Sequence, residues 1–179
     1  MSRRIVNLFL GLACLFVAVT GSFSQTPRRP YGSREIPDAT TSSTADEAKW
    51  WQELKSAAEA VRESHGDKKK IVRFQELLQQ GQEKSYQPPV ADSRPFVLYK
   101  PEPGYTEQAR QRGINGHVIM RAELRPDGFI GEVTIVSGLD DGLNQRAIDV
   151  TRAIVFLPAV KDRKFASYSV HIEDNFSIF

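Results

Sequence analysis

The side chains of this sequence that could hold a metal are its histidines, because imidazole is the commonest metal ligand. His65, His117 and His171 lie far apart along the chain and show none of the short spacings of a metal site. His117 and His171 fall in two strand-like segments and could share one exposed face of a sheet. A shared metal is one interpretation of that placement, and two separate exposed histidines are the ordinary alternative.

Nucleophilic or acid–base chemistry has few candidate residues. Asp140 and Asp141 are adjacent, and we interpret them as a helix start in which Asp141 is the N-cap, since a capping carboxylate accepts hydrogen bonds from the first helical amides. Ser137 lacks the Gly-x-Ser-x-Gly pattern of a nucleophile elbow. No phosphate-binding, dinucleotide-binding or zinc-protease motif occurs in the sequence. We therefore predict that the protein is not an enzyme and that it has no catalytic residue, cofactor or metal.

The composition is that of an ordinary soluble protein with one domain, or one domain and a tail. The chain has 179 residues, of which 40% are hydrophobic and 26% are charged. The formal net charge is only +2, which argues against nucleic acid as a partner because such binding usually needs a concentrated basic face. Cys14 is the single cysteine, so the stability of the folded part must come from its core.

Residues 1–24 have the three-part form of a secretory signal peptide. Arg3 and Arg4 precede an apolar run over residues 5–19, and Ser24 offers a cleavage site after small residues. The run is shorter than the ~20 apolar residues of a membrane-spanning helix. We expect export to the periplasm of a bacterium, and the alternative is a short inner-membrane anchor that leaves the protein facing the periplasm.

A linker and a helical region are expected next. Residues 25–44 are rich in Pro, Ser, Thr and Arg without an apolar period, which predicts a disordered linker. Residues 45–86 predict a helical hairpin. Its first helix begins with a capping box at Thr44 and Glu47, and Gly81 is expected to end its second helix. One apolar stripe of the first helix contains Trp51, Leu54, Ala58 and Val61.

Trp50 and Trp51 have two interpretations. They could form a partner surface, because tryptophan is enriched at interfaces. They could instead cover a small core that belongs to the hairpin alone, which is the interpretation we favour.

Residues 94–179 predict an α+β domain with one three-stranded antiparallel sheet and two helices. A half-buried strand is indicated by the alternation of Val118, Met120, Ala122 and Leu124 with polar residues. Pro126-Asp127-Gly128 then makes a turn, and residues 129–137 return as the second strand. One helix is expected after Thr106, and another after Asp141.

The last strand of this domain is expected to leave an open edge. A right-handed crossover from the second strand would carry it to the far side of the first strand. It would then pair on one side only. Its apolar face includes Tyr168, Val170, Ile172 and Phe176. Asp174 falls on the same face, so we expect a bulge or the rim of the core at that position.

Five separated blocks of this region resemble the TonB C-terminal domain. In chain order they are residues 103–110, 113–118, 126–128, 143–148 and 156–159, which begin with Pro103-Gly104-Tyr105 and end with Phe156-Leu157-Pro158-Ala159. The resemblance covers about residues 95–179, nearly half of the chain.

The resemblance implies a periplasmic domain whose last strand accepts an extended segment of an outer-membrane TonB-dependent receptor, or of another envelope protein, by strand addition. In energised members of the family, an inner-membrane motor pulls through this contact to drive nutrient uptake. The partner-binding residues implied here are Ser167, Tyr168, Ser169, Val170, His171, Ile172 and Glu173. A homodimer through the same strand is a further expectation.

Two departures from the family weigh against coupling to the proton-motive force. Energised members carry a longer N-terminal anchor with a Ser and His pair, whereas this sequence has no histidine before His65. Their long proline-rich spacer is also missing. The alternative function is therefore a structural or envelope adaptor protein that binds through its helical region.

Overall fold

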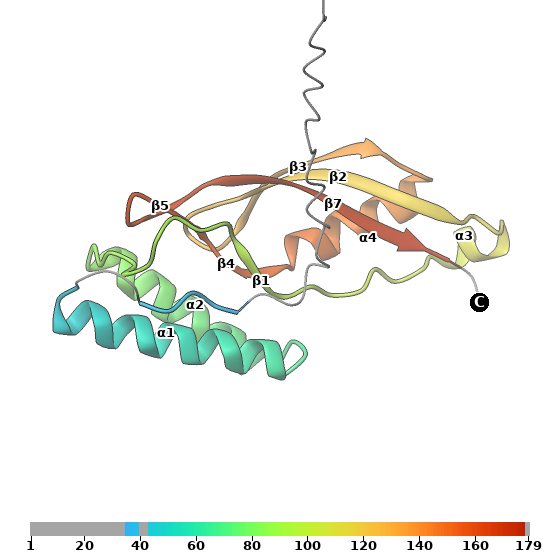
Figure 1. The fold of residues 1–179 in the computed structure, drawn as a ribbon. Coiled ribbons are helices and arrows are strands. Elements are labelled where there is room, and N and C mark those ends of the chain that lie inside the picture. The colour runs from blue at the N-terminus through green and yellow to red at the C-terminus, as the bar shows by residue number, and fades with distance from the viewer. Residues whose placement is uncertain (1–34, 40–42, 178–179) are drawn as a thin grey trace, which may run out of the picture. The chain divides into compact units, whose positions relative to one another are not determined.

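The computed structural model describes residues 35–39 and 43–177. The predicted signal peptide and most of the predicted linker lie outside these ranges. Within them no helix is long and apolar enough to cross a membrane. The elements, in chain order (Figure 1), are α1 (Ala45–Glu63), α2 (Lys68–Glu83), β1 (Phe96–Tyr99), α3 (Glu107–Gln111), β2 (Gly116–Leu124), β3 (Ile130–Ser137), α4 (Asp141–Arg152), β4 (Val155–Leu157), β5 (Ala159–Lys161), β6 (Lys164–Ala166) and β7 (Tyr168–Phe176).

The main sheet has three antiparallel strands in the order β3-β2-β7. The chain passes through α4 between β3 and β7, and β7 returns on the far side of β2, as the crossover rule predicts. The predicted inward-facing residues of β2, from Val118 to Leu124, are all buried, whereas His117 and Arg121 are exposed. The predicted α+β class, strand order and facing are confirmed.

A two-stranded ribbon of β1 and β4 connects this sheet to the helical hairpin. Val97 and Phe156 are paired across the ribbon and pack in a cluster with Leu124 of β2. Leu98, Val155 and Leu157 belong to a different cluster, which contains the buried residues of α1 and α2. Because successive side chains of a strand point to opposite faces, one short ribbon serves both clusters.

The hairpin shares its core with the rest of the described chain. The capping box of Thr44 and Glu47 is present as predicted. The expectation of a small core confined to the hairpin is wrong, because the largest hydrophobic cluster joins both helices to residues of β1, β4 and β5. Ile36 also joins this cluster with 3% of its surface exposed, although it lies in the range expected to be a linker.

The helix α2 ends at Glu83 and not at Gly81. A Cβ atom on Gly81 would lie 2.1 Å from Cζ2 of Trp50. The Trp50 indole also donates a hydrogen bond from Nε1 to the carbonyl of Leu77 at 2.8 Å. The glycine therefore permits a close approach of the indole to α2, and it does not mark the end of the helix.

The helices α3 and α4 pack against the part of the sheet that contains Val118, Met120 and Phe176. Buried residues of α3, α4, β2 and β7 form one cluster: Ala109, Leu143, Ala147, Val118, Met120 and Phe176. The N-cap of α4 is Asp140, whose carboxylate accepts from the amide of Leu143 at 2.8 Å. The prediction of Asp141 as the cap is wrong by one residue, because either aspartate satisfies the sequence rule and only the backbone conformation decides between them.

Candidate functional site

β7 is an edge strand, with β2 as its single strand neighbour in the part of the chain that the structure describes. The register runs without interruption from Gly116 opposite Phe176 to Leu124 opposite Tyr168. The pairing of β2 with β3 shifts twice over a similar length. The nine residues of β7 therefore form a regular ladder on one side only, and an unpaired strand edge can accept another strand.

The side chains of β7 alternate between two environments. Exposed side chains are those of Ser169, His171 and Glu173, and Ser167 is exposed just before the strand begins. Tyr168, Val170 and Ile172 are half-buried, and the latter two pack against the cluster of Leu124 and Phe156. The structure thus places all seven predicted partner-binding residues on one continuous segment with separate polar and apolar faces.

Asp174 does not form a bulge, so this part of the expectation is wrong. It stands in register opposite Val118 and is 2% exposed. Lys100, in the segment between β1 and α3, donates from Nζ to Oδ1 of Asp174 at 2.5 Å and to the carbonyl oxygen of Glu173 at 3.3 Å. A counter-charge from a distant segment, and not a break in the strand, accommodates this aspartate on the apolar face.

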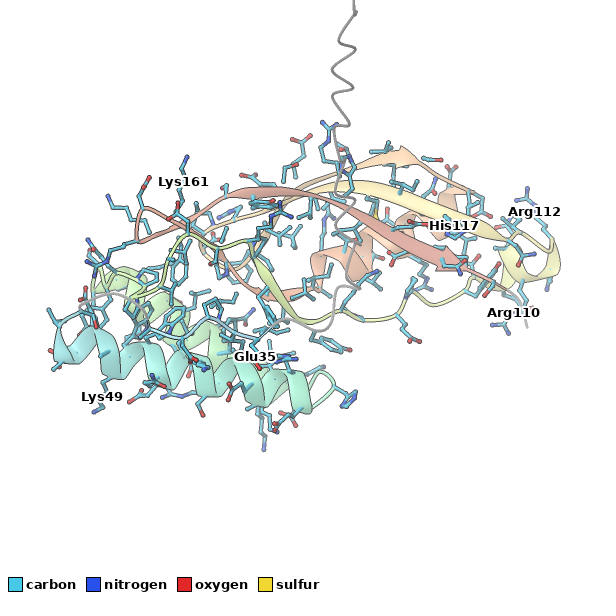
Figure 2. All side chains as sticks on the ribbon, viewed as in Figure 1. Glu35, Lys49, Arg110, Arg112, His117 and Lys161 are labelled. Atoms are coloured by element: carbon cyan, nitrogen blue, oxygen red, sulfur yellow. The ribbon has the colours of Figure 1, made fainter. Side chains whose placement is uncertain are left out.

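The histidines do not meet. His117 stands opposite Asn175, and its Nδ1 lies 2.8 Å from Oε1 of Glu173, whereas His171 stands opposite Arg121. Figure 2 shows His117 at the end of the sheet near α3, where Arg110 and Arg112 also lie. The interpretation of a metal shared by His117 and His171 is therefore wrong. Within the described ranges, no group of three or more His, Cys, Asp or Glu residues could hold a metal ion.

The part of the chain that contains β7 and the five sequence blocks matches a known family. The family described as "Gram-negative bacterial TonB protein C-terminal" matches residues 101–178. These residues, less than half of the chain, are similar to the C-terminal domain of TonB proteins, and we call them the TonB domain below. The matched residues contain α3, α4 and all three strands of the main sheet, β2, β3 and β7.

Solved structures of two TonB C-terminal domains are similar to this chain at 22% sequence identity. The domain from Pseudomonas aeruginosa covers 49% of this chain, with 89% of its own length matched and a TM-score of 0.42. The domain from Helicobacter pylori (residues 179–285) covers 43% of this chain, with 70% of its own length matched and a TM-score of 0.36. No curated protein matches the chain.

A groove opens on the exposed face of the sheet of the TonB domain, at the start of β7. Its volume is about 410 Å³, and its lining residues come from all three strands: Arg121, Glu123, Glu132, Thr134, Ser167, Tyr168 and Ser169. A larger groove of about 650 Å³ lies between the end of α2, the turn after β2, and β6. None of the predicted partner-binding residues lines the larger groove, whereas Ser167, Tyr168 and Ser169 line the smaller one. We therefore take the smaller groove as part of the candidate site.

Trp50 and Trp51 are not available as a partner surface. They are 4% and 1% exposed and belong to the core shared with the TonB domain. The interpretation of this pair as an exposed interface is wrong.

Sequence reasoning missed Lys100 as a residue of the site. The signal that could have found it is Asp174 itself, because a carboxylate on the buried face of a strand needs a cation from another segment.

Proposed function

We propose that this protein binds an extended segment of an outer-membrane receptor along β7 by strand addition, as a periplasmic protein-binding module of the TonB type in nutrient transport. The observation that carries the proposal is the regular nine-residue edge of β7. The unpaired N–H and C=O groups of such an edge supply affinity, and the side chains beside it supply the choice of partner. The periplasmic location rests on the signal peptide predicted for residues 1–24.

The burial of the helical hairpin favours this function over an adaptor that binds through its helices. The apolar stripe of α1 is used inside the molecule, where Leu54, Ala58 and Val61 are fully buried. The backbone of β7 has no strand partner on its outer side in the described structure, and Lys100 contacts it there only at Glu173. We therefore assign partner binding to the segment from Ser167 to Glu173 and a supporting role to the hairpin.

The contact of Lys100 indicates which residues of β7 present their backbone to the open edge. In an antiparallel strand, the N–H and C=O of one residue point to the same side, and the side alternates along the chain. Lys100 lies outside the sheet and reaches the carbonyl of Glu173. We infer that Ser169, His171 and Glu173 present their backbone to the edge, whereas Val170 presents its backbone to β2.

A pair of proline substitutions tests the function. His171→Pro removes an amide donor from the open edge and should abolish capture of the receptor from detergent-solubilised outer membranes of the native host. Its thermal unfolding temperature should change little, because proline is tolerated on an edge strand. Val170→Pro is the matched control: it removes a donor from the ladder with β2 and should lower the unfolding temperature.

Receptor capture would be measured by affinity purification of the full chain followed by mass spectrometry of outer-membrane proteins, with circular dichroism to monitor folding. A folded His171→Pro variant that captures the same receptor as the wild-type protein would overturn the proposal.

A further inference from the structure

The last part of β7 is in contact with side chains from the segment between β1 and α3. Lys100 contacts both Asp174 and the backbone carbonyl of Glu173. A second contact follows five residues later, where the ring of Tyr105 packs edge-on against Phe176 with 5.8 Å between the ring centroids. The segment from Lys100 to Tyr105 therefore lies against the end of β7, from Glu173 to Phe176.

The contact between Lys100 and Asp174 is held in place by burial. Asp174 is 2% exposed, and its Oδ2 atom has no hydrogen-bond partner within the described residues. Loss of the lysine would leave a buried carboxylate without a counter-charge, which is strongly unfavourable. An incoming strand therefore cannot displace Lys100 from this position at low cost.

The side chain of Glu173 is paired across the sheet with β2, on the side away from the open edge. On the exposed face, His117 of β2 pairs with the carboxylate of Glu173 at 2.8 Å. At the opposite end of the strand, Ser167 and Ser169 carry small side chains and border the groove of about 410 Å³. The edge is thus open at Ser167, whereas Lys100 contacts its backbone at Glu173 and pairs with the side chain of Asp174.

We propose that Lys100 and Asp174 determine where the docked strand ends: the partner is an extended segment of about six residues that pairs with Ser167–Ile172 and stops before Glu173. A strand of six residues spans about 20 Å. Large side chains of the segment fit at its Ser167 end, over the groove. This inference rests on the proposed function, because it concerns the length and register of the same docked segment.

The test uses capped peptides of alternating threonine and valine, with four, six, eight and ten residues, because both residue types favour strands. Binding to the full-length protein is measured by titration, and amide hydrogen exchange maps the protected part of β7. For the wild-type protein, affinity should rise from four to six residues and then level off. The amides of Ser169 and His171 should become protected, and those of Glu173 and Asn175 should not.

The double variant Lys100→Met/Asp174→Asn releases the end of the edge without leaving a buried charge unpaired. It should bind the eight-residue peptide roughly threefold or more tightly than the six-residue one, because each added hydrogen bond contributes about 0.5–1.5 kcal/mol. Protection should then extend to Glu173 and Asn175. The control variant Arg73→Met/Glu76→Gln removes an exposed ion pair from α2 with the same change of charge, and it should behave as the wild-type protein does.

Protection of Glu173 and Asn175 in the wild-type protein would overturn the inference and leave the proposed function intact. The inference would also be overturned, with the proposed function intact, if affinity depended on peptide length in the same way for the wild-type protein and the double variant. Protection of no β7 amide by any of the peptides would contradict the proposed function, and the inference with it.

Discussion

Strand β7 and helix α1 both carry a regular apolar pattern, but they use it in different ways. α1 buries its whole stripe, including Trp50 and Trp51, in a core shared with α2 and the ribbon of β1 and β4. β7 buries one face of its side chains, while one side of its backbone has no strand partner in the described structure. The comparison teaches that in this protein the most conspicuous apolar residues stabilise the fold, and that the proposed binding surface is instead the backbone of an edge.

Among the substitutions that test this comparison, the largest loss of stability is expected at Trp51. Trp51→Ala should lower the free energy of unfolding by about 3–5 kcal/mol, because the indole is 1% exposed and packs in the shared core. Urea unfolding measures the loss. The control is Val72→Ala on α2, where the side chain is 51% exposed and the change should stay within about 0.5 kcal/mol. If Trp51→Ala cost no more than Val72→Ala, the indole would not be a core residue, and a role in partner binding would again be open.

A second prediction concerns the contact between the two helices. Helix propensity alone would make Gly81→Ala stabilising by about 1 kcal/mol. The structure predicts the opposite sign, a loss of about 1–3 kcal/mol, because the new methyl group would overlap the Trp50 ring.

Thermal unfolding followed by circular dichroism distinguishes the two signs for Gly81→Ala. Gly142→Ala in α4 is the control, since its Cβ would meet no atom closer than 3.3 Å, and its effect should be much smaller. A more stable Gly81→Ala variant would show that Trp50 does not pack closely on α2.

The smallest effect is a pH dependence centred on Glu47. The backbone amide of Thr44, and after it the amide of Gln87, donate to this carboxylate and hold the pKa of Glu47 below its ordinary value of 4.5. A lowered pKa in the folded protein means that this contribution to stability is present above pH 4.5 and is lost as the pH falls through the folded value.

Glu47→Gln should flatten this part of the curve of unfolding free energy against pH, measured by urea unfolding in steps below neutral pH. Glu63→Gln, a substitution of the same kind at the other end of α1, is the matched control for the loss of one carboxylate from this helix. An identical curve for Glu47→Gln and the wild-type protein would contradict the assignment.

Much of the TonB domain could be predicted from the sequence because its signals are local. The alternation in β2 and the turn at Pro126-Asp127-Gly128 each follow from a few neighbouring residues, and Gly128 has the positive φ of 81° that such a turn requires. The crossover rule then orders the strands. The open edge of β7 follows from that order.

The features that sequence reasoning missed depend on contacts between distant segments. Val155, Phe156 and Leu157 are all buried, so they show no alternation, and nothing local indicates that the ribbon faces two different clusters. A glycine at position 81 is typical of a helix end, and only its contact with the distant Trp50 explains why it lies within α2. Asp174 violates the strand pattern until Lys100, 74 positions earlier, supplies the charge.

The most direct test of the central claim is site-specific photo-crosslinking in living cells of the native host. A photo-reactive amino acid at Ser169, beside the open edge, should crosslink to an outer-membrane receptor that mass spectrometry identifies. The same group at Val72, an exposed position on α2, should give no receptor adduct. A receptor adduct from Val72 with none from Ser169 would contradict docking on β7 and would assign partner binding to the helical hairpin.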